Sequence, residues 1–198
     1  MLINHDLLNS YGGEIITFKT NDYIFQEQQI PKYYYQIISG HIKLNHLSED
    51  GKELIQGIHS AGESVCELLL FIDEKYPVNA VAMSECAVMK VFKSDFIRML
   101  EDHRHVSEDV HKYISYRLFE KFIMMQNLAA HSAETRIKGI LQYFKNYTND
   151  KSLYSYEIKL TRQQLASLSG LRVETVIRRL KKLEKEKFIK IENGKVYY

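Results

Sequence analysis

The spacing of apolar residues changes after Lys93, and this change constrains the possible folds more than any other feature of the chain. From Glu14 to about Phe92, short β-type runs alternate with turn signals. Beyond Lys93, apolar residues recur at three- and four-residue intervals, as they do along one face of a helix. Strands gathered in the first half and helices in the second predict an α+β chain.

The first half predicts an antiparallel β-barrel or β-roll of the double-stranded β-helix or jelly-roll type. Ser39-Gly40 and Asp50-Gly51 separate neighbouring runs. Asp50-Gly51 favours a hairpin, because glycine takes the positive φ that such turns need. The expected strands are Tyr33 to Ile38, Ile42 to Leu47, Glu53 to Ile58, Val78 to Met83 and Cys86 to Phe92.

Two helices are expected next. Ser94 can cap a short helix that runs through Leu100, and a longer helical pattern extends from about His105 to Ala130. The longer helix carries an apolar stripe, which would either pack on the β-domain or form the seam of a homodimer. The members of the stripe are Val106, Val110, Tyr113, Ile114, Leu118, Phe122, Met125 and Leu128.

A further helix from Ala133 to Tyr147 and a polar loop from Asn146 to Tyr156 precede the last module. We place the main domain boundary near His131. The expected division is a sensor-like β-roll over 1–100, a dimerisation helix over 101–130 and a C-terminal domain over 131–198.

The run from Leu160 to Leu180 meets the physical criteria of a helix-turn-helix. Thr161 and Gln164 have the spacing of a capping box, so the first helix begins at a defined residue, and Gly170 provides the turn. Small or apolar residues on the inner faces then pack the two helices together. They are Leu165, Ala166, Leu168, Val176, Leu180 and Leu183.

A short hairpin follows this helix pair. The runs Phe188 to Ile191 and Lys195 to Tyr198 flank Asn193-Gly194, the sequence favoured by type I′ turns. This hairpin forms a wing, whose backbone groups and lysines could contact phosphates and so position the protein on DNA.

Charge is concentrated in the same region. Between Lys159 and Lys190, ten Lys or Arg residues face three Glu, a net charge of +7, although the whole chain carries only +2. A basic segment on an otherwise acidic protein is the electrostatic pattern of a nucleic-acid-binding module, although a basic helix is also common as a solvated surface.

Glu174 and Arg178 are the candidate base-reading residues. They lie one turn apart near the amino end of the second helix, where a recognition helix enters the major groove. Arginine can bind guanine through two hydrogen bonds, and glutamate can accept from the cytosine amino group. The alternative interpretation is an ordinary surface ion pair.

Several classes of protein are disfavoured. The sequence has no P-loop, zinc-ligand spacing or nucleophile elbow, so we expect no catalytic residues, no metal site and no enzyme. The longest wholly apolar run, Leu68 to Ile72, is too short to span a bilayer, and Met1 to Ser10 lacks the features of a signal peptide. We therefore expect a cytoplasmic protein with no membrane contact.

The helix-turn-helix resembles that of the Crp/Fnr family of bacterial transcription regulators. The similarity includes Thr161 to Ala166, Gly170, Val173 to Val176 and Arg178. Upstream, the segments Ile38-Ser39-Gly40, Asp50 to Glu53, Gly62-Glu63 and Glu67-Leu68 occur in the order seen in the cyclic-nucleotide-binding-like β-roll of that family. The resemblance implies a homodimer, joined through the helix at about 105–130, that binds a palindromic DNA operator and contacts RNA polymerase.

The resemblance also implies roles for individual residues. Val173, Glu174 and Arg178 would read bases, and the valine makes the chain more similar to the Fnr branch, whose half-sites contain a TGA-like core. The candidates for contacts with the DNA backbone are Thr161, Arg162, Gln163, Arg172, Thr175, Arg179, Lys182 and Lys195.

The effector of the β-roll is left open, and the resemblance argues against two groups. The arginine that would hold a nucleotide phosphate is absent from Phe71 to Met83, which disfavours cyclic AMP. The amino-terminal cysteines of an iron–sulfur cluster are also absent, and Cys66 and Cys86 are interpreted as small buried residues, with oxidant sensing at Cys66 as the alternative. The residues of the possible effector pocket are Gly62, Glu63, Cys66, Glu67, Leu68 and Lys75.

The competing function is a cyclic-nucleotide-binding-like module that acts through protein contacts. It would account for the β-roll and the long helix. It would leave the capped helix pair, the basic segment and the wing without a role.

Overall fold

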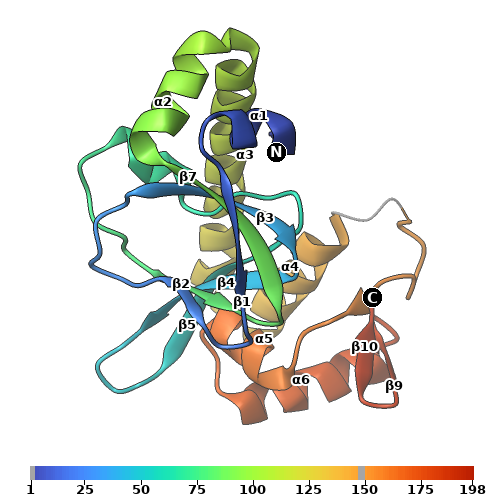
Figure 1. Cartoon of the computed structure of the whole chain (residues 1–198). Coiled ribbons are helices and arrows are strands. Elements are labelled where there is room, and N and C mark those ends of the chain that lie inside the picture. The colour runs from blue at the N-terminus through green and yellow to red at the C-terminus, as the bar shows by residue number, and fades with distance from the viewer. Residues whose placement is uncertain (1–2, 147–149) are drawn as a thin grey trace. The chain divides into compact units, whose positions relative to one another are not determined.

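The computed structural model describes residues 3–146 and 150–198. These residues form two compact units, Met1–Leu118 and Phe119–Tyr198, so the division falls inside one long helix, α3 (Arg104–Ala129). Figure 1 shows the strands of the first unit and the helix-rich second unit. We had expected this helix to be a separate segment between two domains.

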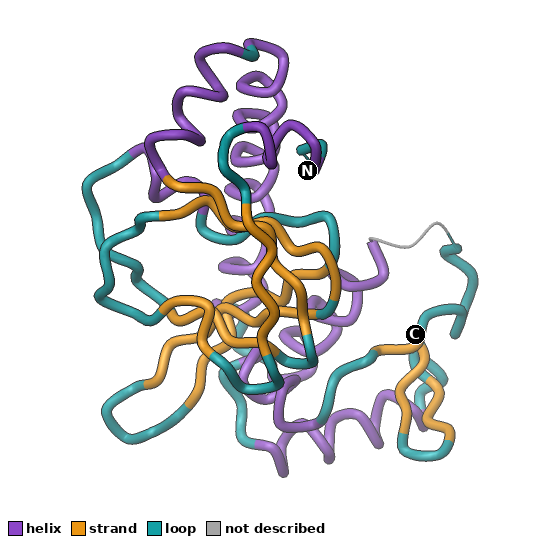
Figure 2. The backbone as a smooth tube through the Cα atoms, viewed as in Figure 1, coloured by secondary structure: helices purple, strands orange, loops and turns teal. Residues whose placement is uncertain are grey.

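The first unit is an antiparallel β-roll, as predicted. One sheet has the order β1-β7-β3 and the other β2-β6-β4-β5. Figure 2 shows these strands in orange. The hairpin expected at Asp50-Gly51 joins β4 to β5, with Leu47 opposite Glu53 and Gly51 at φ +75°. The strands are β1 (Glu14–Phe18), β2 (Tyr23–Phe25), β3 (Tyr33–Ser39), β4 (His41–Leu47), β5 (Glu53–Ser60), β6 (Asn79–Ala82) and β7 (Cys86–Phe92).

Aromatic side chains fill the interior of the roll. The rings of Phe25 and Tyr76 stack with centroids 3.7 Å apart, and Tyr35 lies 5.9 Å from Phe25. All three are buried together with aliphatic residues from both sheets. Tyr76 belongs to the segment from Phe71 to Met83, which lacks the arginine that would hold a nucleotide phosphate. This segment instead contributes a buried tyrosine to the core.

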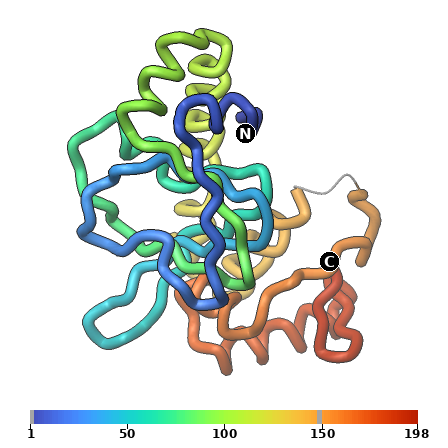
Figure 3. The backbone as a smooth tube through the Cα atoms, viewed as in Figure 1, coloured from blue at the N-terminus to red at the C-terminus, as the bar shows by residue number. Residues whose placement is uncertain are grey.

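A second core lies where helices cover the roll. It contains Leu8 of α1 (His5–Ser10) and Phe96 of α2 (Lys93–Asp102). Figure 3 shows α1 in blue and α2 in green at the same end of this unit, although they are distant in the sequence. The first helix was not predicted. Its signal was one short cap, in which Asn4 accepts hydrogen bonds from the backbone amides of Asp6 and Leu7.

The predicted cap at Ser94 is wrong. Helix α2 begins at Lys93, and Phe92 occupies the cap position without a side-chain hydrogen bond. The reason is tertiary: Phe92 is the last residue of β7, paired with Tyr33, and the Lys93 amide donates to the carbonyl of Lys32. The chain therefore passes directly from strand to helix.

The apolar stripe of α3 divides between two environments. Val106 and Val110 are buried in the helix-covered core of the first unit, which agrees with packing on the β-domain. Farther along the helix, Leu118, Phe122 and Met125 are 55%, 55% and 65% exposed. One half of the stripe thus has a partner within the chain, and the other half is uncovered.

The second unit combines helices with a small sheet. Its elements after α3 are α4 (Ala133–Asn146), β8 (Glu157–Ile158), α5 (Arg162–Ser169), α6 (Val173–Lys185), β9 (Lys190–Glu192) and β10 (Lys195–Tyr197). The predicted end of α4 at Tyr147 lies outside the described residues. The wing hairpin is confirmed, and β8 adds a third strand in the order β8-β10-β9, too short for sequence patterns to predict.

Candidate nucleic-acid interface

The first helix of the predicted helix-turn-helix has the expected capping box. The Gln164 amide donates to Thr161 Oγ1 at 3.1 Å, and the Thr161 amide donates to Gln164 Oε1 at 2.8 Å. Helix α5 ends at Gly170, which has φ +62° and whose amide donates to the Ala166 carbonyl. Both local signals in the sequence therefore fix the length of this helix.

The inner face of α6 packs on α4 and α5. Val176, Leu180 and Leu183 are at most 1% exposed, and Leu165 and Leu168 of α5 are at most 2% exposed. This packing fixes the rotation of α6 about its axis. The opposite face must therefore point to solvent.

The solvent face of α6 carries two of the three candidate base-reading residues, and the third, Val173, is half-buried. Glu174 and Arg178 are exposed, and neither forms an ion pair within the part of the chain that the structure describes. The surface ion pair that we considered as the alternative is not present. Ile177, Lys181, Lys182 and Lys185 line the same open depression. Ile177 lies three residues after Glu174, and Lys181 lies three residues after Arg178. Helical spacing could therefore have identified both residues, which the sequence analysis left out.

The candidate backbone-contacting residues fall into two groups. Thr161, Gln163 and Arg172 are exposed, whereas Thr175 and Arg179 are half-buried. Arg162 donates from Nη2 to the carbonyl of Gly194, 2.9 Å away, and so ties α5 to the wing turn. The turn itself has φ +50° at Asn193 and +78° at Gly194, as a type I′ turn requires.

Two candidate lysines already have carboxylate partners. Lys182 Nζ lies 2.7 Å from Glu134 Oε2, and this hydrogen bond is the main cause of the raised pKa of Lys182. Lys195 Nζ lies 3.0 Å from Glu157 Oε1, which likewise raises the pKa of Lys195. A DNA phosphate would have to compete with these carboxylates.

The residues of the possible effector pocket differ in their exposure. Leu68 and Lys75 are exposed, Gly62 has φ +90°, and Cys66 has φ +55° at the start of the 3₁₀ helix η1 (Glu67–Phe71). Cys66 is half-buried and Cys86 is buried, which raises the pKa of the Cys86 thiol. Among the described residues, no three His, Cys, Asp or Glu side chains gather around a possible metal position.

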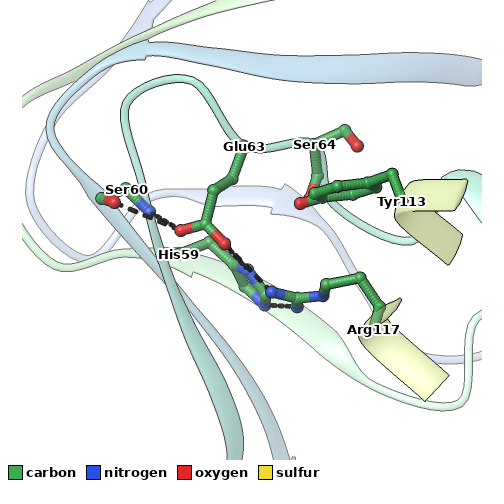
Figure 4. Close-up of polar contacts among 6 residues, drawn as sticks. All are labelled: His59, Ser60, Glu63, Ser64, Tyr113 and Arg117. Carbon is green, nitrogen blue, oxygen red and sulfur yellow. Dashed lines mark hydrogen bonds and ion pairs between the residues drawn. The ribbon is translucent and has the colours of Figure 1, made fainter. Parts of the chain in front are cut away.

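Glu63 is held by a residue that the sequence analysis missed. Arg117 of α3 donates from Nη1 to Glu63 Oε1 at 3.0 Å, and its Nη2 lies 2.7 Å from His59 Nε2 (Figure 4). Since a guanidinium only donates, His59 Nε2 must accept in this contact. The Ser60 amide also donates to Glu63, at 2.8 Å. We call Arg117, Glu63 and His59 the arginine bracket, which joins the end of β5 to α3.

Glu67 lies buried beside this bracket. Its side chain is 3% exposed, and burial raises its pKa. Glu67 Oε2 and Ser64 Oγ are both buried without a hydrogen-bond partner among the described residues. Tyr113 of α3 donates to the Ser64 carbonyl at 3.4 Å. Glu67 therefore faces the interior of the protein rather than an open ligand site.

Two family models match the chain. A cyclic nucleotide-binding domain matches residues 15–103, and a Crp-like helix-turn-helix domain matches residues 135–197. No helix among the described residues has the length and apolar content needed to cross a membrane.

The similar proteins are named as regulators. The transcriptional activatory protein AadR of Rhodopseudomonas palustris is 25% identical over 178 residues, 89% of this chain and 73% of that protein. The anaerobic regulatory protein of Bacillus subtilis is 29% identical, over 88% of this chain and 75% of that protein. The solved structure of the c-di-GMP-responsive global regulator CLP of Xanthomonas campestris matches with a TM-score of 0.79 at 20% identity, covering 98% of each chain.

Proposed function

This chain belongs to the Crp/Fnr family of DNA-binding transcription regulators, and we propose that it binds a palindromic operator as a homodimer. The observation that carries this proposal is the solvent face of α6, where Glu174 and Arg178 are exposed and unpaired among the described residues. Arg178 would bind guanine through two hydrogen bonds, and Glu174 would accept from cytosine. Val173, half-buried at the first position of α6, would contact the same half-site.

The backbone contacts would come from the start of α5, the start of α6 and the wing. Gln163 and Arg172 are exposed and suited to this role, and Thr161, Thr175 and Arg179 flank them. Arg162, Lys182 and Lys195 would first have to give up their present partners. Such contacts position the helix and make binding dependent on salt.

The uncovered half of α3 supports the homodimer. Large apolar side chains in this half are 38–65% exposed, which is costly in water unless a second copy covers them. They are Tyr116, Leu118, Phe119, Phe122, Ile123 and Met125. Two recognition helices would then meet half-sites about 34 Å apart, one turn of DNA.

The β-roll supports binding without a cyclic nucleotide. Phe25, Tyr35 and Tyr76 occupy its interior, and Glu63 is already paired with Arg117. We propose that the purified protein binds its operator without an added nucleotide, in the cytoplasm and in contact with RNA polymerase.

The test is selection of binding sites from a random duplex pool at moderate salt. We expect wild-type protein to enrich a palindrome with a guanine in each half-site, and the Arg178→Ala variant to lose that guanine preference. Arg98→Ala is the control, because Arg98 is exposed and paired with Asp95 in the other unit. If wild type enriches no sequence, with or without cell extract, the chain is instead a module that acts through protein contacts.

A further inference from the structure

Ile177 is the most exposed aliphatic residue of α6, and Val173 at the start of the helix is half-buried. Ile177 is 40% exposed, whereas Val176, Leu180 and Leu183 are at most 1% exposed. Its neighbours in the shared depression are charged: Glu174, Arg178 and three lysines. A single exposed apolar residue is ordinary on a protein surface. An isoleucine in the centre of a charged face that is otherwise suited to DNA calls for an apolar partner.

The major groove of DNA offers one apolar group. Each base pair displays hydrogen-bond donors and acceptors on this edge, and only thymine adds a methyl group, at C5. Ile177 has no hydrogen-bonding atom in its side chain, so it can discriminate bases only through contact with this methyl. Aliphatic and aromatic contacts with thymine are an established means of base recognition.

The position of Ile177 on α6 fits a base next to those read by Glu174 and Arg178. Along the helix axis it lies about 4.5 Å beyond Glu174 and about 1.5 Å before Arg178, at a rise of about 1.5 Å per residue. Successive base pairs are about 3.4 Å apart. The distance along the helix axis from Glu174 to Arg178 is therefore close to the length of two successive base steps. On the basis of the proposed function, we propose that Ile177 selects a thymine adjacent to the pairs read by Glu174 and Arg178.

Replacement of thymine by uracil tests this contact, because uracil lacks only the C5 methyl. Burial of one methyl-sized group changes affinity about fourfold, so the same replacement in both half-sites should weaken wild-type binding about fifteenfold. We would measure fluorescence anisotropy on the selected operator, replacing each thymine position in turn. The same duplexes would be tested with Ile177→Ala, which should bind thymine and uracil equally at the position where wild type discriminates.

Two further variants serve as controls for this test. Ile177→Val retains a branched aliphatic group and should preserve part of the discrimination. Leu153→Ala removes a side chain that is 64% exposed in the same unit and does not line the depression on α6, and this variant should discriminate as wild type does. Circular dichroism would establish that each variant is folded.

The outcomes separate this inference from the proposed function. Failure of wild type to select any duplex would refute the proposed function itself. Selective binding that is insensitive to uracil at every position, or an operator with no thymine beside the guanine, would overturn the role of Ile177 alone. Discrimination that persists in Ile177→Ala would overturn it as well.

Discussion

Replacing Arg117 by methionine should destabilise the first unit by about 2 kcal/mol. Methionine keeps an unbranched, helix-compatible side chain but removes the guanidinium of the arginine bracket. The Arg117 and Glu63 side chains are 15% and 26% exposed, so the cost of breaking their ion pair should lie between the costs for a fully buried pair and for an exposed pair. Removing one partner costs about 3–5 kcal/mol for a fully buried pair, and exposed pairs contribute at most about 1 kcal/mol.

The loss should depend on pH in a defined direction. Burial alone would raise the pKa of Glu63, but His59, the Ser60 amide and Arg117 outweigh it and lower the pKa from 4.5 to about 2. A lowered carboxyl pKa stabilises the folded state above the unfolded pKa, and this contribution disappears as pH falls through the folded pKa. The difference between wild type and Arg117→Met should therefore be complete at pH 7 and should shrink below pH 4.5.

Urea unfolding followed by circular dichroism at pH 7 and pH 3 measures this difference. Hydrogen exchange at pH 7 would place the loss in β5, since the chain has two compact units and a single unfolding transition need not report on one of them. Arg104→Met is the control: its side chain is 92% exposed on the same helix and should change stability by less than about 0.5 kcal/mol. An Arg117→Met variant as stable as this control would refute the reasoning, as would an equal loss at pH 3 and pH 7.

Three other predictions concern the cap, the dimer and the buried acid. Thr161→Ala removes one hydrogen bond of the capping box and should increase the rate of hydrogen exchange in α5 by an amount that corresponds to about 1 kcal/mol. An unchanged exchange rate would contradict the role of the cap. Phe122→Glu places a charge in the uncovered half of α3 and should shift the protein from dimer to monomer in analytical ultracentrifugation, and a dimer that persists would point to another interface. Glu67→Gln should increase stability to urea at pH 8 but not near pH 4. The reason is that the pKa of Glu67 is raised, so its buried carboxyl is ionised, at a cost in stability, only at the higher pH. Equal effects at both pH values would show that Glu67 is not the titrating group.

The sequence predicted elements whose signals are local. The capping box joins residues three positions apart, and Gly170 takes a positive φ that few other residues adopt readily. Helical spacing likewise placed Val176, Leu180 and Leu183 on one buried face. These features could be predicted because the residues that determine each of them lie within a few helical turns of one another in the sequence.

The features that were missed depend on distant partners. Arg117 contacts Glu63 across 54 positions, and nothing near either residue indicates the other. The start of α2 was misplaced for the same reason, because the pairing of β7 with β3 overrides the cap at Ser94. The sequence predicted the apolar stripe on α3 but not its division into a buried and an exposed half. That division depends on where the roll ends, and the spacing of residues along the helix carries no information about this.

The arginine bracket also constrains the length of α3. Arg117 is fixed to the roll, and the next residue of the same continuous helix, Leu118, is the first exposed member of the apolar stripe. One residue inserted between Arg117 and Phe122 would rotate everything beyond it by about 100°, because a helix has about 3.6 residues per turn. Seven inserted residues would restore the angle to within about 20°. Changes in the length of this short segment should therefore be tolerated only in steps close to whole turns.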